Sequence, residues 1–170
     1  INAANLCNAV VTYPFPTVSD NCPNQFTLNT ASGPLTTFNG ITFDVTNNST
    51  LPLTISGFTA PIGSGIHPVA VYYTTTASTA IGNEQTAANW TLLGTTTVNN
   101  SSALSLIEIP VGGLILPAGQ SKGIYIAVTD GSSFGYGQGN STVNNGILTI
   151  TSNNHRGGQY PFFNNNFPRR

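Results

Sequence analysis

The stretch ITFDVT at residues 41–46 alternates apolar and polar residues without a break. Successive side chains of a β-strand point to opposite faces, so this alternation is typical of a strand with one buried face. Similar short runs follow along the chain. We therefore expect further strands at residues 53–56, 69–74, 90–95, 104–109, 123–128 and 147–150.

Clusters of Gly, Pro, Asn and Ser separate these runs and predict turns at residues 47–50, 61–64, 99–102, 111–113, 130–133 and 144–146. No long apolar pattern has helical spacing, and residues 77–89 have room for one helical turn at most. Eight to ten short strands predict an all-β fold, namely an antiparallel β-sandwich that is jelly-roll-like. This domain would span residues 26–170, behind an extended N-terminal arm at residues 1–25.

The arm contains the apolar segment AVVTYPFP at residues 9–16. Proline has no amide hydrogen to donate, so Pro14 and Pro16 exclude a fully bonded central strand and favour an edge strand or an arm. Alternation along an extended segment separates its side chains into two faces. One face carries Val11, Tyr13 and Phe15, and the other carries Val10 and Thr12.

The chain has 170 residues, of which only four are basic and five acidic, with a net charge of −1. This balance excludes a basic nucleic-acid binder and an acidic solvating tail. Ser (14), Thr (24), Asn (21) and Gly (18) together make 77 of the 170 residues. Such a composition is typical of secreted surface and fibre proteins, and we expect an extracellular location. We expect no membrane span, because no apolar run approaches the required ~20 residues.

The sequence begins at Ile1 and contains no Met, which we interpret as removal of a secretory signal. Cys7 and Cys22 lie 15 positions apart, a spacing that does not fit a metal site. In an exported chain they are expected to form a disulfide, worth about 3 kcal/mol in the chain-entropy picture. Two buried free thiols are the alternative.

Asn-x-Ser/Thr sequons are candidate glycosylation sites if the source organism glycosylates its proteins. They occur at Asn47, Asn48, Asn89, Asn99, Asn100 and Asn140.

Two parts of the chain resemble known extracellular modules. Residues 6–23, LCNAVVTYPFPTVSDNCP, resemble part of a hyalin-repeat module, although the rest of that pattern does not follow. From about Leu35 onward, phrases such as NWTLLG (89–94), IPVGGL (109–114) and LPAGQ (116–120) are similar to β-sandwich domains of large secreted bacterial surface proteins. Both resemblances imply adhesion or structural modules rather than enzymes. The second also implies a further strand after the Pro168-Arg169 element.

Catalytic and metal sites have little support in the sequence. The acids Asp20, Asp44, Glu84, Glu108 and Asp130 are spread over different segments, and no local motif pairs them. His67 and His155 have neither zinc spacing nor a nearby acid in sequence, and we interpret both as loop residues. We expect no enzyme activity and no cofactor.

Calcium and carbohydrate are the remaining ligand candidates. Asp20 and Asp130 are weak calcium candidates, with turn formation through local backbone amides as the alternative. Exposed aromatic rings would be needed for a carbohydrate site, and the candidates are Trp90, Tyr72, Tyr136 and the cluster at residues 160–167. The pattern around Trp90 favours a place in the core.

These observations predict an extracellular structural subunit that forms a homopolymer, a filament or surface fibre. The arm would be exchanged between subunits as a donor strand, with Val10, Val11, Tyr13 and Phe15 at the interface. Folding of the arm back onto its own domain stays open as an alternative. The alternative function is an adhesin or carbohydrate-binding module of a larger secreted protein, with cell-surface or glycan ligands.

Overall fold

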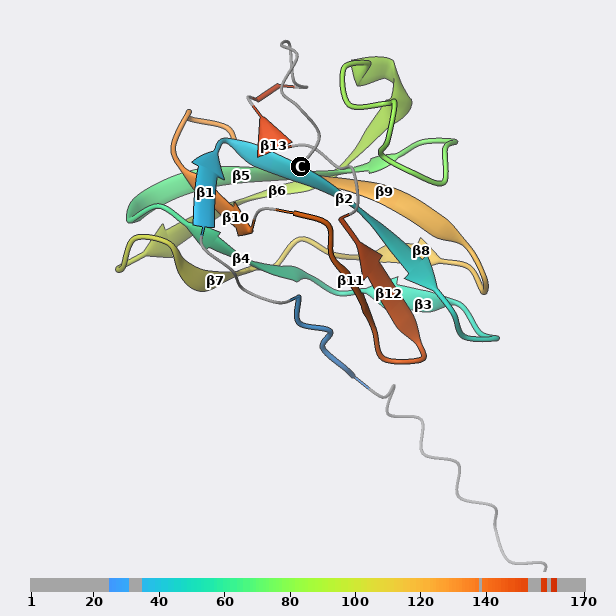
Figure 1. Ribbon diagram of the computed structural model, residues 1–170. Helices are drawn as coiled ribbons and strands as arrows, with labels where there is room; N and C mark the ends of the chain where they lie inside the picture. Colours follow the sequence, from blue (N-terminus) through green and yellow to red (C-terminus); the bar gives the residue numbers. More distant parts are fainter. Residues whose placement is uncertain (1–24, 31–34, 138, 153–156, 159, 162–170) are drawn as a thin grey trace, which may run out of the picture.

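The computed structural model describes residues 25–30, 35–137, 139–152, 157–158 and 160–161, and this part of the chain is nearly all β (Figure 1). The expected all-β sandwich is confirmed. Its strands are β1 (Leu35–Phe38), β2 (Gly40–Asn47), β3 (Leu53–Ile55), β4 (Phe58–Ile62), β5 (Gly65–Thr74), β6 (Trp90–Asn100), β7 (Ser105–Ile109), β8 (Leu114–Leu116), β9 (Ser121–Val128), β10 (Phe134–Gly137), β11 (Thr142–Asn144), β12 (Leu148–Thr151) and β13 (Gly157–Gly158).

The strand order is that of a jelly roll. A four-stranded sheet has the order β1-β10-β4-β7, and a seven-stranded sheet contains the run β2-β9-β5-β6. The chain passes repeatedly from one sheet to the other, and every pairing is antiparallel. The hairpin of β11 and β12 extends the larger sheet beyond β2, while β3 and β8 form a separate two-stranded ribbon.

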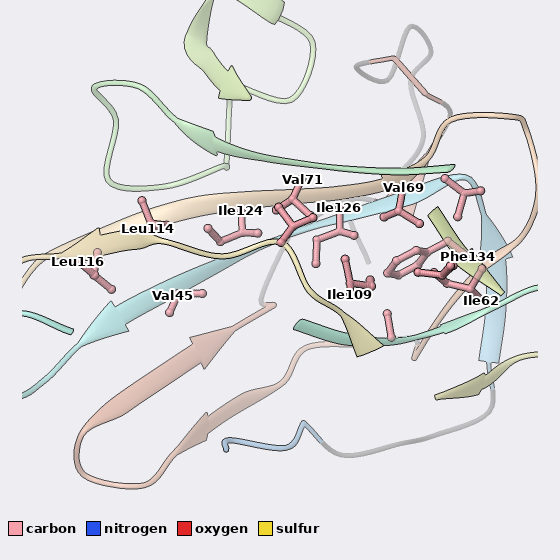
Figure 2. Packing of buried hydrophobic residues seen from close by; sticks show 14 of the residues in the cluster. Val45, Ile62, Val69, Val71, Ile109, Leu114, Leu116, Ile124, Ile126 and Phe134 are labelled. Carbon is pink, nitrogen blue, oxygen red and sulfur yellow. The ribbon is translucent and has the colours of Figure 1, made fainter. Parts of the chain in front are cut away.

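The main core lies between the two sheets. Strand β9 occupies the middle of the larger sheet and directs Ile124, Ile126 and Val128 into this core. Alternate residues Tyr125 and Ala127 belong to a second buried cluster on the opposite face. Strand β9 is therefore buried on both faces. Figure 2 shows core side chains of the larger sheet facing those of the smaller one, among them Val69, Val71, Ile126, Ile62, Ile109 and Phe134.

The loop at residues 75–89 covers the second cluster. The carboxylate of Asp44 on β2 anchors this loop by accepting hydrogen bonds from the Thr79 hydroxyl at 2.6 Å and the Ala80 amide at 2.8 Å. The Trp90 indole nitrogen donates to the Asn83 carbonyl at 2.9 Å. The loop contains one short 3-10 helix (η1, Ala87–Asn89), in agreement with the expectation of one helical turn at most.

The turn expected at residues 61–64 is wrong in its first half, because Pro61 and Ile62 belong to β4. Pro61 pairs with Leu106 of β7, whereas β10 pairs with β4 only at Ile62. Position 61 therefore has no ladder bond to lose on its β10 side, which is where a strand tolerates proline.

Candidate functional site

In the part of the chain that the structure describes, the longest open sheet edge belongs to β6. This strand ends the seven-stranded sheet and pairs with β5, and among the described residues no strand pairs with its other side. We call the free side of Trp90–Asn100 the β6 edge. Its sequence, WTLLGTTTVNN, contains neither a charged residue nor a proline. Natural proteins usually protect an edge strand with such residues, because unpaired backbone groups are a template for another strand.

The β6 edge has a long regular part. The register between β5 and β6 shifts next to Leu93, which has no partner of its own on β5. From Gly94 to Asn100 the pairing continues without interruption, over a length of roughly 20 Å for seven residues. Side chains along this part are small and polar on the outer face, where Thr95, Thr97 and Asn99 are exposed.

The other free edges in the described part of the chain are shorter. Strand β7, which ends the four-stranded sheet and contacts β6, has five residues and carries the exposed Glu108. Strands β1 and β11 have four and three residues. Beside the β6 edge, Leu106 of β7 is 72% exposed, and Leu92 of β6 is 50% exposed. The side of the sandwich formed by β6 and β7 thus combines a long ladder with apolar side chains.

A second feature is an open cleft of about 370 Å³ at one end of the sandwich. It is lined by Gly63, Ser64, His67, Ala103, Leu104, Ser132 and Ser133. His67 lies near the beginning of β5, and its ring joins two turns. Nδ1 is 2.9 Å from Oδ2 of Asp130, and Nε2 is 2.9 Å from the carbonyl oxygen of Ser64.

The interpretation of His67 as a loop residue is wrong, because His67 belongs to β5, and the fold brings Asp130 to it from 63 positions away. The hydrogen bonds to Asp130 and to the Ser64 carbonyl raise the pKa of His67 above its usual value, against the opposing effect of burial. Burial alone would raise the pKa of Asp130, but the bonds from His67 and Ser132 outweigh it and lower that pKa.

The cleft offers little of what general-base catalysis requires. A carbonyl and a carboxylate both accept hydrogen bonds, so each ring nitrogen of His67 serves as a donor. A general base needs a free ring lone pair within reach of a substrate proton. The two oxygens of Asp130 are likewise used, by His67 and by the Ser132 amide at 2.9 Å.

Asp130 therefore behaves as the turn residue that was the alternative to a calcium ligand. The described residues contain no group of three or more His, Cys, Asp or Glu that could hold a metal ion. Asp44 and Glu84, two of the dispersed acids, bind backbone amides of the loop at residues 75–89, with Glu84 Oε2 accepting from the Gly82 amide at 2.7 Å. Asp20 lies outside the described residues.

The sequons divide into buried and exposed sites. Asn47 is fully buried, and its amide nitrogen donates to the carbonyls of Leu51 and Leu116. Asn100 is 4% exposed and donates to the carbonyl of Ile62. The folded chain thus leaves neither amide accessible for a glycan, which corrects the expectation for these two positions. Asn89 is half-buried. The remaining sequon residues are exposed, namely Asn48, Asn99 and Asn140.

The aromatic residues considered for carbohydrate binding are mostly internal. Trp90 and Tyr136 are buried, and Trp90 packs against Tyr125 in the second cluster. Tyr72 is half-buried and stacks on Tyr125 at a centroid distance of 5.7 Å. Burial and the hydrogen bond to the Tyr160 hydroxyl raise the pKa of Tyr72 to about 12. These rings do not form an exposed platform for a sugar.

Several predicted residues lie outside the described part of the chain. They are Cys7, Cys22, the donor-strand residues Val10, Val11, Tyr13 and Phe15, His155, and residues 162–167 of the aromatic cluster considered for carbohydrate binding. The disulfide, the division into arm and sandwich, and the path of the arm stay predictions. Sequence reasoning also missed the β6 edge, although the uncharged run at residues 90–100 was visible in the sequence.

No family model, curated protein or solved structure matched this chain. In the described part of the chain, no helix has the length and apolar character needed to cross a membrane.

Proposed function

We propose that this chain is an extracellular structural subunit that assembles with copies of itself into a filament. In this proposal, residues 9–16 of one subunit add as a strand to the β6 edge of the next. The observation that carries the proposal is the β6 edge itself, which is long, uncharged, free of proline and without a paired strand among the described residues.

The segment at residues 9–16 suits such an edge in its backbone chemistry. Along an extended strand, the N–H and C=O groups of successive residues point to alternate sides. Pro14 and Pro16 have the same parity, so both can face away from β6. The residues of the other parity, including Val11, Tyr13 and Phe15, then direct their amides toward the acceptor strand. The two prolines also terminate the sheet, because their side cannot accept a further fully bonded strand.

The side chains of the segment provide the apolar contribution. Burial of three or four groups such as Val11, Tyr13 and Phe15 contributes roughly 5–10 kcal/mol before the cost of ordering the segment. Leu92 and Leu106 are exposed apolar groups on the acceptor side, and strand addition would bring apolar side chains near them. Main-chain hydrogen bonds and side-chain burial would therefore act together.

The low charge of the chain is compatible with permanent assembly. Burial of unpaired charges in an interface is costly, whereas Thr and Asn side chains can be buried when they form hydrogen bonds. The outer face of β6 presents Thr95, Thr97 and Asn99 in place of charges. Because the donor segment and the acceptor edge are different surfaces, repetition of one contact produces an open filament when the rotation between subunits does not close into a ring.

The test compares the complete chain with a variant that lacks residues 1–16, by electron microscopy and light scattering. We expect regular filaments from the complete chain and monomers from the shortened one. Filaments from the shortened variant would reject strand exchange by this segment. A complete chain that stays monomeric would indicate instead that the arm folds back on its own domain or binds another protein.

A synthetic peptide of residues 9–16 provides a second measurement. Added to the shortened variant, it should protect the backbone amides on the free side of β6 from hydrogen exchange. A peptide with Val11, Tyr13 and Phe15 replaced by Ser is the matched control and should give no protection. Protection at β1 or β7 in place of β6 would keep strand addition but assign a different acceptor edge.

A further inference from the structure

We propose that His67 is a proton-operated latch, which holds the turn at residues 63–65 while both ring nitrogens carry hydrogen and releases it when one hydrogen is lost. The latch connects three elements: the turn between β4 and β5, the beginning of β5, and the turn after β9 that carries Asp130. It is independent of the proposed assembly.

The geometry requires the doubly protonated ring. The carbonyl of Ser64 has no hydrogen to donate, and neither has an ionised carboxylate, so both contacts at 2.9 Å need an N–H from His67. Only the imidazolium has two N–H groups. The side chain is 12% exposed, and its two hydrogen bonds lie near the surface of the molecule. The observed arrangement is therefore that of the charged ring.

When the His67 ring loses one hydrogen, the hydrogen bond to the Ser64 carbonyl is the one that breaks. A hydrogen bond to a carboxylate is stronger than one to a neutral carbonyl, so the hydrogen on Nδ1 stays with Asp130. The lone pair of Nε2 then faces the carbonyl oxygen of Ser64, and two acceptors at 2.9 Å repel each other. The turn must move or water must enter between the two atoms.

The turn has the freedom to move. Ser64 is exposed and lies between Gly63 and Gly65, and Gly65 adopts a φ of +112° that side chains rarely allow. On one side, the Gly63 amide keeps its bond to the Ser133 carbonyl at 2.8 Å. On the other side, Gly65 begins the pairing of β5 with Asn100 at the end of β6. Release of Ser64 should thus loosen the first pairs of this ladder.

Asp130 is the charged group that controls the latch. The turn at residues 63–65 and the loop at residues 101–104 carry no charged side chain, and Val98, the partner of His67 on β6, is apolar. The other charged side chains of the described residues form hydrogen bonds at a different loop or lie on a different strand, so they do not contact His67. Asp44 and Glu84 accept hydrogen bonds from backbone amides of the loop at residues 75–89, and the Lys122 ammonium group donates to the Thr75 carbonyl at the beginning of that loop. Glu108 lies on β7, opposite Thr59 of β4.

The experiment is an NMR titration of the complete chain, with His67→Gln used to assign the His67 signal and separate it from that of His155. We expect His67 to titrate above pH 6.5, the ordinary value. Over the same pH range, the amides of the first ladder pair, Gly65 and Asn100, should lose protection from hydrogen exchange by roughly fivefold beyond the intrinsic pH effect, the value of one modest hydrogen bond. A midpoint at or below 6.5, or protection that does not follow the midpoint, would overturn the latch.

Two carboxylate variants sharpen the test. Asp130→Asn removes the charge beside Nδ1 and should lower the titration midpoint of His67 toward the ordinary value. Glu108→Gln removes an exposed carboxylate on β7 and should leave that midpoint unchanged. An equal shift in both variants would mean that general electrostatics, not the latch, sets the titration. The wild-type titration decides the matter if Asp130→Asn does not fold.

Discussion

The backbone of Ala80 lies directly against Gly123 on the outer face of β9, so close that a β-carbon at position 123 would overlap the Ala80 nitrogen. The Gly123 amide accordingly bonds a side chain of the neighbouring strand, the Thr74 hydroxyl, at 3.0 Å. The loop at residues 75–89 is seated on the sheet at this point. Absence of a side chain at position 123 is therefore a condition for closing the second buried cluster.

The substitution Gly123→Ala should destabilise the fold by about 1–3 kcal/mol, because the loop at residues 75–89 must shift away from β9. Denaturant unfolding followed by Trp90 fluorescence measures the change. Gly63→Ala is the matched control, since its nearest neighbours would be 3.5 Å or more from the new β-carbon. Equal losses in the two variants would contradict the close approach as the cause.

The substitution Asn47→Ala should cost about 1–3 kcal/mol, because it removes the buried hydrogen bond to the Leu116 carbonyl as well as the bond to the Leu51 carbonyl. Asn48→Ala, one residue further along, removes an exposed amide that donates to the Thr149 hydroxyl and should change stability by about 0.5 kcal/mol or less. Chemical denaturation of both variants checks the difference. A similar cost at the two positions would refute the buried role of Asn47.

Stability should depend on pH through His67 and Asp130. The raised pKa of His67 gives a contribution that is complete below pH 6.5 and is lost as the pH rises through the folded-state pKa. The lowered pKa of Asp130 gives a contribution that is present above its ordinary value of 3.8 and is lost as the pH falls through the lowered value. Thermal unfolding should therefore show a higher Tm at pH 5.5 than at pH 8.

His67→Gln is the control for this pH dependence. It lacks the ring at position 67 and keeps His155, so its Tm should change less between pH 5.5 and pH 8 than that of the wild type. A wild-type Tm that falls from pH 5.5 to pH 8 by the same amount as that of His67→Gln would show that other groups govern the pH dependence.

The substitution Thr97→Lys should abolish or strongly weaken assembly, since a charge on an edge strand opposes the addition of another strand. Thr97 is exposed, so the fold itself should tolerate the change within about 0.5 kcal/mol. Thr59→Lys makes the same change on β4, between β7 and β10, and should leave assembly intact. Light scattering and electron microscopy distinguish the two. Filaments of normal length from Thr97→Lys would show that β6 is not the strand to which the donor segment adds.

Alternation along the chain predicted much of the sandwich. The run at residues 41–46 became β2, and the runs at residues 69–74 and 123–128 became parts of β5 and β9. Strand β8 was missed because its three residues, LIL, are all apolar and do not alternate. Strand β10 was missed because its sequence, FGYG, contains two glycines, which resemble a turn signal. Strand β4 was missed because Pro61 resembles a turn signal. A proline fits within this strand because the neighbouring strand β10 pairs with β4 only at Ile62 and forms no ladder bond at position 61.

The amino-acid sequence by itself determined that this protein is a layered, all-β molecule with an uncharged polar surface, since side-chain alternation and composition are local properties. Only the tertiary structure decided which of several residues of the same type are buried, exposed or placed beside a partner. It buried Asn47 and exposed Asn48, and it placed Asp130 beside His67 across 63 positions. Such differences depend on contacts between distant strands, and those contacts arise only when the two sheets pack around a common core.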